Sequence, residues 1–131
     1  MKPIAAALSA SVFLSVMSLA SAAQASEKLA SDKGCLACHQ TNKKLVGPAY
    51  EVVAATYADK TSEQYKKFVA LNDKKLTIQD YIARNIKNGG AGKWGPIPMP
   101  PQAVTEDEAK ALAKWVVSLA PKVDTKPPAK K

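Results

Sequence analysis

The chain contains only two cysteines and one histidine, and all three lie within residues 35–39, which read Cys-Leu-Ala-Cys-His. Two thiols three positions apart, with an imidazole directly after the second, have the spacing with which a protein bonds both cysteines to haem as thioethers and offers the histidine to the iron. The pattern predicts Cys35 and Cys38 as covalent haem attachment sites and His39 as an axial iron ligand.

Two other kinds of site use closely spaced cysteines. A tetrahedral zinc site would have to take its remaining ligand from a carboxylate, because the chain offers no further Cys or His. A redox dithiol of the thioredoxin kind should follow a strand at the start of a helix, and no strand pattern precedes Cys35. Haem attachment is therefore favoured over a redox dithiol, and both over zinc.

The first 25 residues resemble a secretory signal peptide. Lys2 is followed by an apolar stretch over residues 4–20 and by Ala-Gln-Ala at residues 23–25, which is typical of a cleavage site. An uncleaved membrane anchor is the alternative, since the apolar stretch is nearly long enough to span a thinned bilayer. We expect cleavage after Ala25 and export to a bacterial periplasm, where haem attachment would consume the thiols that would otherwise form a disulfide.

Residues 26–120 are long enough for one domain, and residues 121–131 form a basic tail rich in Pro and Lys that we expect to be disordered. Without Lys2 the chain has 18 basic and 11 acidic residues, a formal net charge of +7. An exported protein is unlikely to meet nucleic acid, so this charge favours acidic redox partners or, at most, peripheral contact with an anionic membrane. A domain this small buries a modest core, so a buried porphyrin should contribute to folding.

The sequence pattern predicts an all-α fold of four to five helices around one covalently bound haem. Helical periodicity and capping residues are found at five places, and no stretch alternates as a strand would. The predicted helices begin at Ser26 and end at Gly34, span residues 49–58, lie within residues 59–75, run from Thr77 to Gly89, and run from Thr105 to Pro121.

Apolar side chains at helical spacing predict which face of each helix is buried. Thr105 and Glu108 have the spacing of a capping box at the start of the last helix. The predicted buried residues are Val52, Val53 and Tyr57, then Tyr65, Phe68 and Val69, then Ile78, Ile82 and Ile86, and finally Leu112, Trp115, Val116 and Leu119.

The loop over residues 94–101 contains four prolines, at positions 96, 98, 100 and 101, which exclude helix and sheet and stiffen the backbone. Met99 lies within it and is the only methionine that would remain after Met1 and Met17 leave with the signal peptide. With no second histidine, the sixth iron position could take the Met99 thioether, a lysine amine, water or nothing. A single methionine in a rigid loop favours Met99 over a packing role.

The Gly47-Pro48 pair offers a rigid backbone carbonyl nine residues after His39. A ligating histidine usually donates its second ring N–H to a fixed acceptor, so the Pro48 carbonyl is a candidate partner of His39. An ordinary turn is the simpler interpretation of Gly-Pro.

Together the motif at 35–39, Leu-Val-Gly-Pro at 45–48, Ile-Lys-Asn-Gly at 86–89, the loop at 94–101 and Ala-Lys-Trp-Val at 113–116 resemble a class I monohaem cytochrome c. The resemblance is to the small periplasmic bacterial branch, the cytochrome c five-fifty-one kind, and covers residues 26–120. It implies His39 and Met99 as axial ligands and the Pro48 carbonyl as the partner of His39. It also implies that Trp94 hydrogen-bonds a haem propionate, and that the N- and C-terminal helices cross over the haem with one haem edge exposed.

The sequence departs from the pattern of that family at two supporting positions. Gln102 stands where the family often has an asparagine that donates to the methionine sulfur. A propionate-binding arginine would fall at Asn85, whereas this chain has Arg84, about 100° away around a helix. Arg84 and Gln102 are the nearest residues of this chain that could replace those two contacts, and we predict them as supporting haem contacts.

These features predict a monomeric one-electron carrier that shuttles electrons between respiratory-chain proteins and is not an enzyme. Iron with both axial positions filled by protein has no open site for oxygen or peroxide. One alternative is a haem subunit permanently docked on a periplasmic oxidoreductase. Another is a ligand-binding or peroxidatic haem protein, which would require the Met99 bond to break.

Overall fold

The computed structural model describes residues 26–71 and 76–121. The predicted signal peptide and all but the first residue of the predicted tail lie outside this part of the chain. No helix among the described residues is long and apolar enough to cross a membrane.

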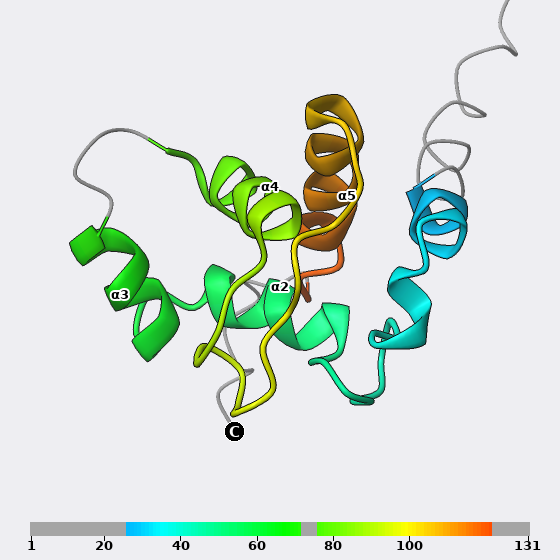
Figure 1. The fold of residues 1–131 in the computed structure, drawn as a ribbon. Coiled ribbons are helices and arrows are strands. Elements are labelled where there is room, and N and C mark those ends of the chain that lie inside the picture. The colour runs from blue at the N-terminus through cyan, green and yellow to red at the C-terminus, as the bar shows by residue number, and fades with distance from the viewer. Residues whose placement is uncertain (1–25, 72–75, 122–131) are drawn as a thin grey trace, which may run out of the picture.

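The described residues form helices joined by loops (Figure 1). Their only β-structure is two isolated β-bridges. A helix over residues 26–32 leads into a short 3₁₀ helix, η1. The bounds are Cys35–Ala37 for η1, Tyr50–Ala58 for α2, Glu63–Leu71 for α3, Ile78–Asn88 for α4 and Glu106–Ser118 for α5. The predicted all-α class is therefore confirmed.

The helices begin where the capping residues predicted. The Thr77 hydroxyl accepts from the Asp80 N–H at the start of α4, and Thr105 and Glu108 form both bonds of a capping box at the start of α5. α5 ends slightly before Pro121, because the last N–H groups, those of Leu119 and Ala120, bond to carbonyls three residues back.

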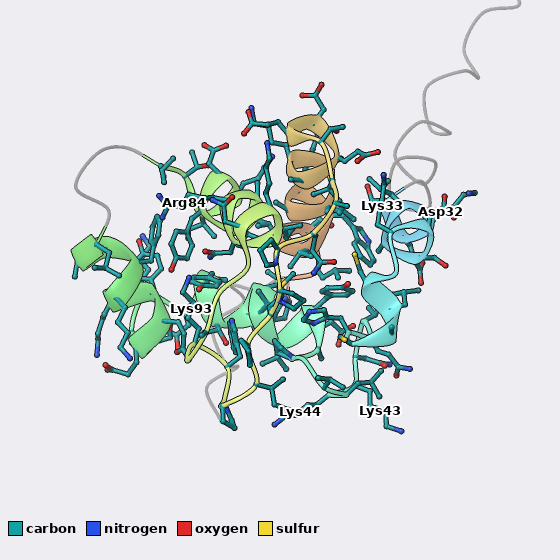
Figure 2. All side chains as sticks on the ribbon, viewed as in Figure 1. Asp32, Lys33, Lys43, Lys44, Arg84 and Lys93 are labelled. Atoms are coloured by element: carbon teal, nitrogen blue, oxygen red, sulfur yellow. The ribbon has the colours of Figure 1, made fainter. Side chains whose placement is uncertain are left out.

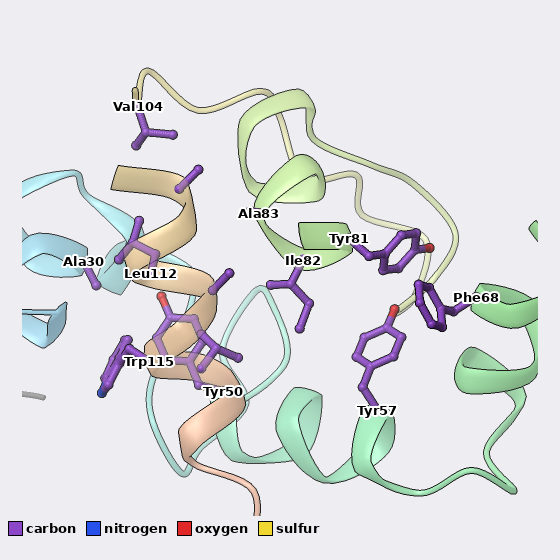
Figure 3. Packing of buried hydrophobic residues seen from close by; sticks show 13 residues of the cluster. Ala30, Tyr50, Tyr57, Phe68, Tyr81, Ile82, Ala83, Val104, Leu112 and Trp115 are labelled. Carbon is purple, nitrogen blue, oxygen red and sulfur yellow. The ribbon is translucent and has the colours of Figure 1, made fainter. Parts of the chain in front are cut away.

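The core lies where α4 and α5 pack together and α2 crosses beneath them (Figure 1). Figure 3 shows two aromatic groups on either side of Ile82. In one, Tyr50 of α2 meets Trp115 of α5 edge-on, with ring centroids 5.1 Å apart. In the other, Tyr81 of α4 meets Phe68 of α3 at 5.0 Å. Tyr57 of α2 also meets Tyr81, at 5.8 Å, so aromatic contacts connect α2, α3, α4 and α5.

The helix over residues 26–32 packs against α5 (Figure 1). Ala30 is fully buried in the core, and the Lys33 ammonium lies 3.1 Å from the Glu108 carboxylate. This agrees with the contact between the N- and C-terminal helices that the family resemblance implied.

Two of the predicted buried positions are wrong. Val52 of α2 and Val69 of α3 are 51% and 53% exposed. α2 instead buries Tyr50, Ala54 and Tyr57, which recur at intervals of three and four residues. The prediction left Tyr50 out of the buried face of α2, so the face that it assigned is rotated about the helix axis relative to the observed one.

Candidate functional site

The backbone after the first helix places both cysteines and the histidine together. Gly34 adopts the left-handed conformation with φ of 75° and ends the helical segment, as predicted. The N–H groups of Cys38 and His39 both bond to the Cys35 carbonyl, at 3.1 and 2.9 Å. The motif is therefore held as one compact turn.

His39 is oriented by its second ring nitrogen. Its Nδ1 lies 2.8 Å from the Pro48 carbonyl oxygen, which confirms the predicted hydrogen bond. A carbonyl can only accept, so Nδ1 donates and the neutral ring keeps the lone pair on Nε2. The ring also stacks on Tyr50, with centroids 5.2 Å apart and planes 21° apart.

Gly47 allows this histidine to lie close to the backbone. A Cβ on Gly47 would come within 2.7 Å of His39 Nδ1 and 2.9 Å of Nε2, closer than real Cβ contacts. The Gly47 N–H also donates to the Cys38 carbonyl at 2.7 Å. The Gly-Pro pair thus supplies both the close approach and the acceptor that the histidine needs.

The proline-rich loop folds back onto the end of α4. Gly90 and Met99 form an antiparallel bridge. The distance is 3.0 Å from Gly90 N to the Met99 oxygen and 2.8 Å from Met99 N to the Gly90 oxygen. Gly89 has φ of 71°, and a Cβ on it would meet the Met99 carbonyl and lie 2.8 Å from Pro101 N. The position of Met99 therefore depends on a backbone contact that only glycine allows.

Most of the predicted site residues line one cavity of about 650 Å³. This volume lies within the range of cofactor sites. The predicted residues in its wall are Cys35, Cys38, His39, Pro48, Trp94, Met99 and Gln102. Apolar side chains of three helices complete the wall, namely Val53 and Tyr57 of α2, Ile82 and Ile86 of α4, and Leu112, Trp115 and Val116 of α5.

Arg84 does not line this cavity, so the structure does not support it as a haem contact. Its guanidinium lies over the Tyr81 ring, 5.4 Å from the centroid, on the exposed side of α4 (Figure 2). Asn85, one residue later, lines the cavity. The 100° rotation between consecutive helical residues accounts for the difference.

Gln102 lines the cavity, but its amide is engaged with the backbone. Its Nε2 donates to the Pro100 carbonyl at 2.7 Å, and its own N–H reaches the Lys87 carbonyl at 3.3 Å. Gln102 therefore stabilises the loop that carries Met99, through one hydrogen bond within the loop and one to α4.

Three further cavity residues were not identified as site residues from the sequence. Tyr50 stacks on His39, and the Lys93 ammonium donates to Asn85 Oδ1 at 2.9 Å. The position of Tyr50, two residues after Pro48, was the only available signal. Asn85 and Lys93 are eight residues apart, and only the return of the loop brings them together.

The cysteine side of the cavity is uncharged. Burial raises the pKa of the Cys35 thiol. Burial also raises the pKa of the Tyr50 phenol, and the nearby Cys35 adds to that shift. Both groups are protonated at neutral pH, so this wall suits an apolar surface.

The residues fit a haem with covalent attachment. Two thiols, an imidazole with its Nε2 lone pair and a thioether line one largely apolar cavity. Among the described residues, the charged side chains in that wall are Lys44 and Lys93, and both are positive. No cluster of three or more His, Cys, Asp or Glu that could bind a metal ion occurs within 26–71 and 76–121, so the zinc alternative has no ligand set there.

Comparison with known proteins agrees with this site. The family model "Cytochrome c" matches residues 23–120. Cytochrome c-552 of Hydrogenobacter thermophilus is 44% identical over 108 residues, which cover 82% of this chain and 95% of that protein. Cytochrome c-551 of Pseudomonas aeruginosa is 47% identical over 92 residues, which cover 70% of this chain and 74% of that protein.

A solved structure is similar as well. The crystal structure of wild-type Nitrosomonas europaea cytochrome c552 has a TM-score of 0.57 and 41% sequence identity, covering 71% of this chain and 98% of that one. The chain therefore belongs to the cytochrome c family, as a small class I monohaem cytochrome c that carries electrons on one covalently bound haem c.

Proposed function

We propose that this protein is a periplasmic one-electron carrier that shuttles electrons between respiratory-chain proteins. In this proposal Cys35 and Cys38 form the haem thioethers, and His39 and Met99 are the axial iron ligands. When bound there, the haem would supply one-electron redox chemistry at its iron. The protein supplies attachment, orientation and an apolar surround.

The single observation that carries the proposal is the hydrogen bond from His39 Nδ1 to the Pro48 carbonyl within the cavity that Met99 also lines. It fixes the neutral tautomer and directs the lone pair to Nε2, as a metal-ligating histidine requires. Pro48 is therefore a positioning residue. Trp94 lines the same cavity, and its indole N–H is a candidate donor to a haem propionate.

Export to the periplasm rests on the signal-peptide pattern of residues 1–25, which lie outside the described residues. In an oxidising compartment the thioethers would keep both cysteines out of disulfides. The basic tail predicted over residues 121–131 also lies, apart from Pro121, outside the described residues.

An exposed apolar lip is the candidate docking surface for redox partners. Leu45, Val46 and Ile97 line the cavity yet are 38%, 52% and 61% exposed. Lys43 and Lys44 are exposed beside them, on the loop after the haem motif (Figure 2). We infer a weak, small interface in which partner carboxylates meet these lysines, as redox encounters use.

We expect electron transfer to the physiological partner to slow as ionic strength rises, because salt screens exposed charges beyond about 8 Å. Replacing Lys43 and Lys44 with Gln should weaken this salt dependence. The control pair is Lys60 and Lys67, which are exposed just before α3 and on it. No residue of α3 lines the cavity. Truncation after Ala120 should also weaken the dependence without shifting the haem spectrum. A rate that stays flat or rises with salt would mean that the apolar lip, and not the lysines, makes the contact.

The test of a free shuttle is the native mass of the protein in its own periplasmic extract. A shuttle should elute as a small monomer in the periplasmic fraction and reduce or oxidise added partner proteins. Elution with a larger oxidoreductase would favour the alternative of a permanently docked haem subunit. Recovery only in the membrane fraction would contradict cleavage of the signal peptide.

A further inference from the structure

The cavity wall contains positive charge without a matching negative charge. Among the described residues its charged side chains are Lys44 and Lys93, and no carboxylate lines it. Lys93 is only partly exposed and forms no ion pair with a described Asp or Glu. Removing an ammonium from water without a counter-charge is costly, so an anionic partner would stabilise this arrangement.

Lys93 is held in place by neutral groups. Its Nζ donates to Asn85 Oδ1 at 2.9 Å and lies 4.7 Å from the centroid of the Tyr81 ring. Its carbonyl accepts from Gln64 Nε2 of α3 at 3.3 Å. An ammonium has three N–H donors, and the contacts with Asn85 and Tyr81 account for at most two of them. Because Lys93 lines the cavity, a third donor is left for an anion bound there.

The titratable and charged groups packed around Lys93 leave its charge unneutralised. Tyr81 of α4 lies under the ammonium, Arg84 of α4 and Tyr57 of α2 contact the Tyr81 ring, and α3 contributes the neutral Gln64. Burial is the largest single influence on the pKa of Tyr81 and acts to raise it, but hydrogen bonds from Lys93, Asn85 and Tyr57 and the positive charge of Lys93 together lower it. The ammonium therefore exerts a field that stabilises nearby anions.

We propose that Lys93, oriented by Asn85, is the counter-ion of a haem propionate in this protein. The proposal rests on the proposed haem site. It assigns the propionate contact to the loop after α4 and not to Arg84, which lies outside the cavity wall. By keeping the propionate ionised, Lys93 keeps the charge near the iron constant, so the reduction potential should vary little with pH.

The test is a pH titration of the haem-loaded ferric protein, following the proton NMR shifts of the haem methyl groups, together with the reduction potential over the same range. An opposite charge within a few ångströms lowers a carboxyl pKa by about 1–3 units. Wild-type protein should therefore show a propionate midpoint below the ordinary carboxyl value of about 4. K93Q should raise this midpoint by about 1–3 units. The reduction potential of K93Q should then fall as the pH rises through the new midpoint, because the ionised propionate stabilises ferric iron.

Three variants provide the controls. K44Q removes the same charge from the other lysine of the cavity wall, on the loop after His39, and R84Q removes the other cation over Tyr81. Both should leave the midpoint near its wild-type value. K93R keeps the charge and should retain the low midpoint.

An unchanged midpoint in K93Q, or an equal shift in K44Q or R84Q, would overturn the assignment. If K93Q fails to fold, a wild-type midpoint at or above the ordinary carboxyl value would overturn it instead. Haem that resists extraction and an intact sulfur-to-iron band in the wild type would show that the proposed function stands even where the Lys93 assignment fails. Their absence in the wild type would contradict the proposed function itself.

Discussion

Replacing Cys35 and Cys38 together with Ala is expected to leave no haem bound after acid-acetone extraction and a largely unfolded chain. The cavity of about 650 Å³ is lined by apolar groups of α2, α4 and α5. Without the haem these apolar groups would be exposed to water, and a domain this small buries little other apolar surface to offset the loss. The variant should therefore collapse or unfold, as measured by far-UV circular dichroism and extraction.

Met99→Ala is the matched control, because it removes a proposed axial ligand and leaves both thioethers in place. It should retain haem through the same extraction and keep its helical signal. Haem that resists extraction from the double Cys variant would contradict covalent attachment at this motif.

Met99→Ala itself is expected to abolish the weak sulfur-to-ferric charge-transfer band and to open the iron to carbon monoxide. A thioether ligand favours ferrous iron, so the reduction potential should fall by on the order of a tenth of a volt, within the roughly 0.8 V span that axial ligands control. Absorption spectra, carbon monoxide titration and potentiometry measure these changes. An unchanged spectrum, or a wild-type ferric protein without the band, would limit Met99 to packing and favour the peroxidatic alternative.

A second pair of variants tests whether the backbone bridge presents Met99. Gly89 and Gly92 both have a positive φ, 71° and 73°, so Ala is strained at each position, by about 1–3 kcal/mol. A Cβ on Gly92 meets nothing within 4 Å, whereas a Cβ on Gly89 collides with the Met99 carbonyl. Gly89→Ala should weaken the sulfur band and Gly92→Ala should not. Equal behaviour of the two variants would show that the bridge does not determine the position of Met99.

The local features of this protein follow from the sequence alone. A capping box needs only Thr105 and Glu108 three residues apart, and Thr77 caps α4 in the same local way. The hydrogen bond from His39 to Pro48 spans only nine residues, and the glycine that permits it lies next to the acceptor. Interactions this short in sequence depend little on how the rest of the chain packs.

Contacts between distant segments were decided by the tertiary structure. Arg84 and Asn85 are both polar residues of α4, and only the packing of α4 against α5 determines which of them lies at the cavity wall. Val52 has the apolar character of a core residue, yet α2 turns Tyr50 and Ala54 inward instead. Periodicity shows that a helix has an apolar face, but the rotation of that face is set by the partners it packs against.

The sequence by itself determined the haem chemistry of this protein, because its only cysteines and its only histidine form one motif and its only methionine after residue 25 lies in a rigid loop. The electrostatic surroundings of that haem were decided by the fold. Lys93 reaches Asn85 and Tyr81 only because the loop returns along α4 through the Gly90–Met99 bridge. Ligand types are a property of residues and short spacings, whereas the field around a site depends on which distant charges the packed chain brings within a few ångströms of it.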